Sequence, residues 1–280
     1  MSFRYSIILP AFNEGSRIGP GLEKALAFIR EQGWKAEIIV VDDGSSDNTA
    51  EVIRGFMREA PELSPQQAKG GLVGDPELRL LENPGNRGKG YSVRHGMLNA
   101  RGEVLLFSDA DFSSPIAESV KLIEAIEQGA DVSFGSRWLL AEMQTRRQSL
   151  LRQFVGRAYN VLSRMLLGLP YKDMQCGLKA FNRRAAETVF TRQQIERWGF
   201  DPELLFIARK FGLKMTEVPV EWAHDDRSKI NPIVDGIKMF WELLRIRINN
   251  VAGRYERPTF QFVSDTGDAG PLLVEGHHPA

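Results

Sequence analysis

The stretch 105-LLFSDADFSSP-115 carries an apolar run that ends in two carboxylates, Asp109 and Asp111, directly before a helix-start signature. The apolar run predicts a buried strand. On an extended strand, residues two apart point to the same side. Two carboxylates on one side make a hard-oxygen site suited to Mg²⁺ or Mn²⁺. The alternative is an Asp-x-Asp that caps the following turn and helix, so the neighbouring strands have to separate the two interpretations.

Short apolar runs alternate with helical patterns through the first half of the chain. Strands are expected at 5–9, 37–41, 78–82, 103–108 and 131–135. Helices are expected at 16–32, 47–60, 88–100 and 115–128. This alternation favours an α/β fold, with a mostly parallel, doubly wound sheet flanked by helices in a single domain over residues 1–255. We interpret the Pro- and Gly-rich segment 61–76 as a surface loop, and residues 256–280 as a disordered tail.

Three polar clusters follow predicted strands, at the point where each strand ends. They are 10-PAFNE-14, 42-DDGSSD-47 and 109-DAD-111. In doubly wound sheets, ligands bind beyond the carboxyl ends of the strands, so all three clusters are expected to face one crevice. This convergence favours a metal site at Asp109 and Asp111 over a simple cap.

The second cluster and a glycine-rich segment each allow two interpretations. Asp42 and Asp43 form either a turn with a helix cap or an acceptor for the N3–H of a uracil-type base. The segment 84-PGNRGKGYS-92 offers backbone N–H groups and Lys89 near a helix start, which suits an anion or a close backbone approach. It does not match the phosphate-loop pattern, and no G-x-G-x-x-G follows the first strand. A P-loop NTPase and a Rossmann dehydrogenase are therefore disfavoured.

The charge balance and the cysteine content narrow the class of protein. Lys+Arg and Asp+Glu are both 36, so the formal net charge is zero and no nucleic-acid partner is expected. Cys176 is the single cysteine, which excludes an internal disulfide framework and fits a reducing, cytoplasmic setting. We expect it to be a packed residue. We expect neither a signal peptide nor a spanning helix, which needs a run of roughly 18 apolar residues or more.

The ordered motifs resemble a known family. The series PAFNE, VVDDGSSDNT, NRGKGYSVRHG, LLFSDAD and FGSR resembles the inverting family 2 glycosyltransferases of GT-A fold. The second half narrows the resemblance to dolichyl-phosphate β-glucosyltransferases, through 173-DMQCGLKAFNRRAA-186, 197-RWGFDPELLFIARKFG-212, 217-EVPVEW-222 and 228-SKINP-232. It covers residues 4–254.

The resemblance implies UDP-glucose as the donor, a polyprenyl phosphate as the acceptor, and Mg²⁺ or Mn²⁺ held by Asp109 and Asp111. With Lys89 from the glycine-rich segment, the expected nucleotide-sugar site comprises Pro10, Ala11, Phe12, Asn13, Glu14, Val41, Asp42, Asp43, Asp109, Ala110, Asp111, Asp173 and Gln175. The uracil would be held by Val41 and Asp43. Arg137 would meet a phosphate.

Two segments of the second half suit a membrane surface. Residues 144–170 place several arginines between apolar residues at helical spacing, as in helices that lie on anionic membranes; the alternative is a surface helix with solvated arginines. Residues 231–252 form either core packing or a second surface-lying helix. We expect a peripheral protein on the inner face of the membrane, with the acceptor phosphate held by Arg137, Arg152, Ser228 and Lys229.

The nucleophile decides which residues catalyse the reaction. A hydroxyl must lose a proton to a general base, whereas a phosphate monoester is already ionised. Asp201 and Glu203, at an expected helix start, are candidates for a base or for orienting the acceptor; the alternative is favourable charge at the helix N-terminus. Asp173 and Gln175 are candidates for sugar contacts or a polar turn. The expected catalytic residues are Asp111, Arg137, Asp201 and Glu203.

The sequence is compatible with four functions. The leading hypothesis is glucosyl transfer to a polyprenyl phosphate with inversion. The second is transfer from a UDP-sugar to a glycan or small-molecule hydroxyl, which would require a base among Asp173, Asp201 and Glu203. A non-catalytic nucleotide-sugar-binding protein would not need the full metal site. A nucleotidyltransferase would need a better phosphate-binding loop after the first strand than PAFNEGSR.

Overall fold

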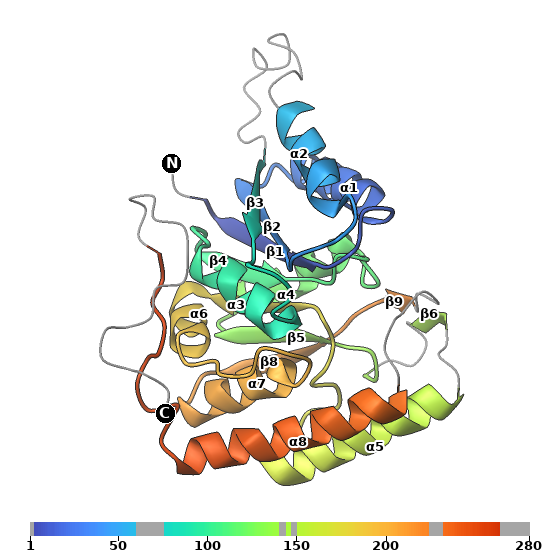
Figure 1. The fold of residues 1–280 in the computed structure, drawn as a ribbon. Coiled ribbons are helices and arrows are strands. Elements are labelled where there is room, and N and C mark those ends of the chain that lie inside the picture. Colours follow the sequence, from blue (N-terminus) through green and yellow to red (C-terminus); the bar gives the residue numbers. More distant parts are fainter. Residues whose placement is uncertain (1–2, 60–75, 140–143, 147–149, 224–231, 264–280) are drawn as a thin grey trace.

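A seven-stranded sheet organises the computed structural model, which describes residues 3–59, 76–139, 144–146, 150–223 and 232–263. The strand order is β3-β2-β1-β4-β7-β5-β8. The bounds are β1 (Tyr5–Ala11), β2 (Ala36–Asp42), β3 (Glu77–Glu82), β4 (Val104–Phe107), β5 (Val132–Ser136), β7 (Lys179–Asn182) and β8 (Met215–Pro219). The five strands expected from the sequence are confirmed. The doubly wound α/β sheet flanked by helices is confirmed as well (Figure 1).

The sheet is parallel except for β7, which pairs antiparallel with both β4 and β5. The sequence pattern did not predict β7. It has only four residues, and it begins with a lysine instead of an apolar residue. Because β7 runs the other way, its first residue, Lys179, pairs with Phe107 at the end of β4. The start of β7 therefore lies at the edge where the parallel strands end.

The helices largely follow the expected order. Their bounds are α1 (Ile18–Glu31), α2 (Thr49–Glu59), α3 (Lys89–Leu98), α4 (Ser119–Glu127, after a 3₁₀ turn at Ile116–Glu118), α5 (Leu150–Leu167), α6 (Arg183–Phe190), α7 (Phe200–Lys210) and α8 (Pro232–Val251). The expected helix over 144–170 is wrong at its start. Gln144–Arg146 forms β6, which pairs with β9 (Trp222–Ala223), and residues so paired cannot also be helical.

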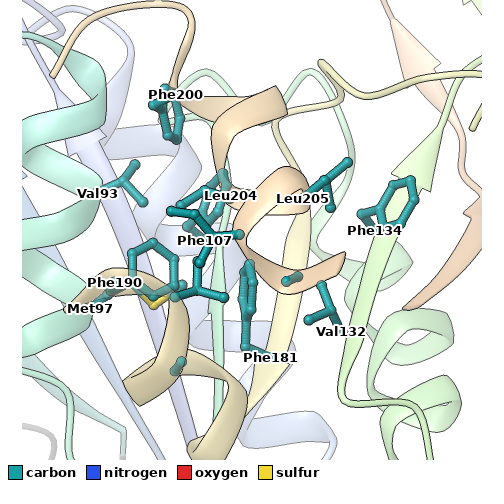
Figure 2. Packing of buried hydrophobic residues seen from close by; sticks show 14 of the residues in the cluster. Val93, Met97, Phe107, Val132, Phe134, Phe181, Phe190, Phe200, Leu204 and Leu205 are labelled. Atoms are coloured by element: carbon teal, nitrogen blue, oxygen red, sulfur yellow. The ribbon is translucent and has the colours of Figure 1, made fainter. Parts of the chain in front are cut away.

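Each face of the sheet carries its own hydrophobic layer. In β1, Ile7 and Leu9 pack on one face with residues of α1 and α4, whereas Ile8 packs on the other. That second face is covered by α3, α6 and α7. Figure 2 shows aromatic residues filling this layer: Phe107, Phe181, Phe190 and Phe200. Strands buried on both faces explain why the sequence showed continuous apolar runs instead of alternation.

The two longest helices lie together at one side of the molecule. Figure 1 shows α5 and α8 side by side along the lower edge, beyond α7. Over the described ranges, no helix combines the length and the low polarity that a membrane crossing requires.

The ordered chain continues past the boundary expected at residue 255. Backbone N–H groups of Thr259 and Phe260 donate to the Thr191 carbonyl, at 2.7 and 3.0 Å, and Val263 donates to Leu98 at 2.9 Å. Phe260 and Phe262 pack on the core. The packing of these aromatic rings explains why residues 256–263 differ from the expected disordered tail. The expected loop at 61–76, except for residue 76, and residues 264–280 lie outside the described residues.

Candidate active site

The carboxylate pair follows β4 at the switch point of the sheet, where the chain order reverses between β1 and β4. The Lys89 ammonium lies 2.5 Å from Oδ1 of Asp109. Burial alone would raise the pKa of Asp109, but the charge and hydrogen bond of Lys89, together with the charges of Lys179 and Arg137, outweigh burial and hold that pKa below its ordinary value. Gly177 leaves room for this carboxylate, because a Cβ there would come within 2.1 Å of Asp109 Oδ2.

The two carboxylates come together by a turn, and the extended geometry assumed from the sequence is wrong. β4 ends at Phe107, and the Phe112 N–H donates to the Asp109 carbonyl at 3.0 Å. Phe112 has a φ of 48°, an uncommon value for a non-glycine residue. Burial, and next the charge of Asp109, raise the pKa of Asp111. The effect of Asp109 on Asp111 indicates that the two carboxylates lie close together.

The carboxylate pair fits a divalent cation whose remaining ligands come from outside the protein. Mg²⁺ is commonly held by one or two carboxylates, with phosphate and water oxygens completing the shell. Asp109 and Asp111 supply two such groups. Within the described ranges, no cluster of three or more acidic, His or Cys side chains forms a site made of protein ligands alone. The residues therefore suit a cation shared with a ligand.

The polar segment after β1, residues 10–14, is held in place by the polar segment after β2, residues 42–47. Asn13, with a φ of 54°, receives a hydrogen bond from the Ser46 N–H on its Oδ1 at 2.8 Å, and its own N–H donates to Ser45 Oγ at 2.8 Å. The Glu14 carboxylate pairs with Arg17. Phe12 is exposed at the rim, Pro10 is partly exposed, and Ala11 is buried. The turn after β1 therefore keeps Phe12 accessible.

Asp43 holds the glycine-rich segment in place. Its carboxylate accepts hydrogen bonds from Asn83 Nδ2 at 2.8 Å, from the Arg87 N–H at 2.9 Å and from the Gly88 N–H at 2.8 Å. Asp42 accepts from the hydroxyl of Ser45. The Val41 side chain is fully buried in the hydrophobic core.

The glycines of residues 84–92 serve close backbone contacts. A Cβ on Gly44 would meet Gly85 Cα at 2.5 Å, and one on Gly88 would meet the Glu196 carbonyl at 2.6 Å. A Cβ on Gly90 would meet the Ile195 carbonyl at 2.7 Å. Of the two interpretations left open, the geometry selects close approach, while Lys89 still reaches the carboxylates.

Arg137 and Asp173 form a second charged pair beside the first. Arg137 follows β5, and its Nε and Nη2 donate to the two carboxylate oxygens of Asp173 at 2.6 and 2.9 Å. Burial alone would raise the pKa of Asp173, but the charge and hydrogen bonds of Arg137, together with the charge of Lys179, outweigh burial and lower it. The Gln175 N–H donates to Asp173 at 3.2 Å. The Arg137 guanidinium also lies 5.4 Å from the Trp222 ring centroid.

The two expected acids of α7 occupy different environments. Asp201 receives the ammonium of Lys179 at 2.5 Å, and that ammonium also donates to the Cys176 carbonyl at 2.7 Å. Glu203 is fully buried and accepts from the backbone of Gln194 and Ile195 and from the hydroxyl of Tyr255. The structure therefore places Asp201 near the charged cluster and Glu203 in the interior, away from it.

Sequence reasoning missed Lys179. It is fully buried. Its charge helps to lower the pKa of Asp109, where Lys89 contributes more, and the pKa of Asp173, where Arg137 contributes more. A lysine at the start of a short apolar run was the available signal. Three residues expected to hold the acceptor phosphate cannot be placed in the site. Ser228 and Lys229 lie outside the described residues, as does the side chain of Arg152 on α5.

A GT-A sheet with a carboxylate pair at its switch point defines this protein as a glycosyltransferase. The chain belongs to glycosyl transferase family 2, whose family model matches residues 6–190. It is 37% identical to a dolichyl-phosphate beta-glucosyltransferase of Trichomonas vaginalis, over 89% of this chain and 72% of the relative. It is 34% identical to the dolichyl-phosphate beta-glucosyltransferase of Drosophila melanogaster, over 93% of this chain and 79% of that relative.

Solved structures confirm the fold at lower identity. Glucosyl-3-phosphoglycerate synthase from Mycobacterium tuberculosis, solved with phosphoglyceric acid, superposes with a TM-score of 0.60 at 18% identity, over 87% of this chain and 80% of that one. The same enzyme, solved with Mn²⁺, uridine diphosphate and glucosyl-3-phosphoglycerate, superposes with a TM-score of 0.57 at 19% identity, over 91% of this chain and 81% of that one.

Proposed function

We propose that this protein transfers glucose from UDP-glucose to a polyprenyl phosphate, with inversion at the anomeric carbon and with Mg²⁺ or Mn²⁺ present. The names of the relatives support both the sugar and the class of acceptor. A structural neighbour that holds Mn²⁺ and uridine diphosphate is consistent with such a donor.

The observation that carries the proposal is the state of the three candidate bases. Asp201 is engaged by the Lys179 ammonium and Asp173 by the Arg137 guanidinium. Glu203 is buried beneath three donors. None of the three is an unengaged carboxylate facing an acceptor. A hydroxyl nucleophile needs such a group, but a phosphate monoester does not, because it is already ionised.

Cations beside the carboxylate pair suit a phosphate nucleophile. Lys89 and Arg137 both act electrostatically on Asp109, so both lie close to it. A phosphate acceptor and a diphosphate donor bring several negative charges to one place, and fixed cations lower the cost of that approach. Asp109 and Asp111 would hold the divalent cation. When bound, it would neutralise charge on the departing diphosphate.

The surface of α5 and α8 suits a lipid substrate. Met165 on α5 is 77% exposed, Val251 on α8 is 84% exposed, and Trp241 and Ile248 are exposed as well. Arg164, Arg245 and Arg247 are exposed beside them. Glu242 is the one carboxylate among the described side chains of these helices, and it accepts from the Gly199 N–H. Apolar and basic side chains together favour the surface of an anionic membrane.

The experiment is transfer of label from radiolabelled UDP-glucose in detergent with Mg²⁺, with and without a polyprenyl phosphate. We expect label to enter the organic phase only when the lipid phosphate is present, and to be lost with EDTA or in Asp111→Ala. Nuclear magnetic resonance of the product should show the β anomer. Label that moves to water alone, or to a soluble hydroxyl, would overturn the proposal.

A further inference from the structure

A buried chain of side chains runs from α3 to Asp43. Asn83, directly after β3, donates from Nδ2 to Asp43 Oδ1 at 2.8 Å. Its Oδ1 lies 2.8 Å from Nδ1 of His95 on α3. All three residues are buried. The chain begins in the interior and ends at the carboxylate that resemblance assigns to the nucleobase.

The direction of every bond in this chain is fixed by counting donors. Ser92 uses its hydroxyl hydrogen on the Gly88 carbonyl at 3.2 Å, so Ser92 Oγ must accept from Asn83 Nδ2 at 3.0 Å. Asn83 thus spends both amide hydrogens on Asp43 and Ser92, and its Oδ1 is left to accept. His95 must therefore carry a hydrogen on Nδ1. A flipped amide would set its oxygen against the Asp43 carboxylate.

The charge state of His95 agrees with this direction. Burial, and next the neighbouring Arg94, lower the pKa of His95 to about 4. The ring is neutral near pH 7 and has one N–H, which the Asn83 oxygen receives.

The chain leaves Asp43 with little spare capacity. A carboxylate offers roughly four acceptor positions. Asn83 and the backbone of Arg87 occupy two on Oδ1, and the backbone of Gly88 occupies one on Oδ2. What remains is one acceptor position on Oδ2, in an orientation fixed by three donors. A single fixed acceptor pairs with an N–H and repels a lone pair.

We propose that Asn83 and His95 are positioning residues that orient the Asp43 carboxylate and thereby set the preference for a uracil base over a cytosine base. Uracil presents N3–H to an acceptor, whereas cytosine presents a lone pair at N3. This inference rests on the proposed UDP-sugar donor, and deepens it by naming what selects the base.

The test compares binding of UDP and CDP by titration calorimetry with Mg²⁺, in the full chain. Asn83→Asp keeps the size of the side chain but removes the donor and places a second carboxylate beside Asp43. We expect the ratio of the CDP to the UDP dissociation constant to fall by about tenfold or more. We also expect KM for UDP-glucose to rise while kcat changes little, since the base lies away from the bond that breaks.

Two further variants make the outcome decisive. Asn99→Asp is the matched control, because Asn99 is also buried and donates to the His95 carbonyl at 2.9 Å but has no contact with Asp43. It should keep the ratio. His95→Leu removes the outer donor and should lower the ratio less than Asn83→Asp does, and His95→Gln should restore part of it. His95→Leu also serves if Asn83→Asp does not fold.

An unchanged ratio in folded Asn83→Asp or His95→Leu overturns the inference, as does an equal loss in Asn99→Asp. The wild-type protein separates this inference from the proposed function. If it binds UDP selectively but glucosylates a hydroxyl, the acceptor proposal fails and the inference on Asn83 stands. If it binds no UDP, both fail.

Discussion

At the scale of single residues, the site depends on interior charges that are paired. Lys179 is fully buried, and its partner Asp201 is nearly so. Taking two charges out of water is costly, and only a close partner repays that cost. Lys179 lies close enough to Asp109 to help lower the pKa of its carboxyl. Gly177 leaves room for Asp109, and the preceding residue, Cys176, accepts a hydrogen bond from Lys179 on its carbonyl. Lys179 therefore connects the carboxylates of the crevice to the start of α7.

Removing one member of this pair should be worse than removing both. Lys179→Met leaves the Asp201 carboxylate buried without a partner, which costs about 3–5 kcal/mol of unfolding free energy. The double variant Lys179→Met/Asp201→Leu should recover a large part of that loss. Urea unfolding measures the unfolding free energy of the wild type, the single variant and the double variant. A single variant as stable as the wild type would contradict the account of this pair.

Glu203 should make stability depend on pH. Burial raises the pKa of Glu203 to about 7, from an ordinary 4.5. A raised pKa means that the fold favours the protonated acid, so this contribution is present below pH 4.5 and is lost as pH rises through about 7. Relative to Glu203→Gln, which does not titrate, the wild type should lose about 3 kcal/mol across that window.

The measurement is the unfolding free energy of both proteins at several pH values. Glu124→Gln, on the exposed face of α4, serves as the control for replacing a glutamate at the surface. Parallel curves for the wild type and Glu203→Gln would show that the three donors to Glu203 outweigh its burial.

At the scale of elements, three chain segments stack by backbone contact: the turns after β2 and β3 and the segment before α7. Gly44, Gly88 and Gly90 make the approach possible. Two carboxylates hold the segment before α7. Glu203 accepts the Gln194 N–H, and Glu242 of α8 accepts the Gly199 N–H at 2.6 Å. This stacking sets where α3 begins, and so where Lys89 lies.

Two helical glycines give a matched test of the stacking. Gly90→Ala in α3 would place a Cβ 2.7 Å from the Ile195 carbonyl and 2.8 Å from Phe200 Cβ. It should destabilise the fold by about 1–3 kcal/mol. Gly55→Ala in α2 meets nothing within 4 Å. It should stabilise the fold by about 0.5–1 kcal/mol, because alanine favours helix. Thermal unfolding compares them, and equal effects would contradict the stacking.

The elements also show what the sequence could predict. Five apolar runs located β1 to β5, and the rule for doubly wound sheets placed the polar clusters at the carboxyl ends of the strands, because both depend on local patterns. The pattern missed β7, whose pairing is between distant segments, and it took Gln144–Arg146 as helix although these residues pair with β9. Asp109 and Asp111 were identified from an assumed extended strand, although a turn brings them together. No local signal could show that Glu203 is buried or that Lys179 reaches Asp201.

At the scale of the whole molecule, the charged cluster and the α5–α8 surface lie on different parts of one body. The carboxylate pair follows β4 at the carboxyl edge of the parallel strands, and α5 and α8 run along one side of the molecule (Figure 1). The hydrogen bond between Glu242 and Gly199 links α8 to the residues just before Asp201. α8 therefore contacts the segment that leads into α7, the helix that carries Asp201.

Membrane binding should depend on the exposed apolar side chains of these helices. Met165→Glu places a negative charge on the α5–α8 surface and should weaken sedimentation with vesicles of phosphatidylglycerol and phosphatidylcholine by about tenfold. Met57→Glu is the matched control, since Met57 is 37% exposed on α2, away from that surface. Equal effects of the two substitutions would contradict a membrane-facing role for α5 and α8.

The acceptor that we propose is an ionised phosphate, which needs no protein base. The most direct measurement offers the wild-type protein UDP-glucose and Mg²⁺ with two acceptors of the same chain length, a polyprenyl phosphate and the corresponding polyprenol. The account predicts glucose on the phosphate and none on the alcohol, because Asp173, Asp201 and Glu203 are all engaged. Transfer to the polyprenol at a comparable rate would contradict it.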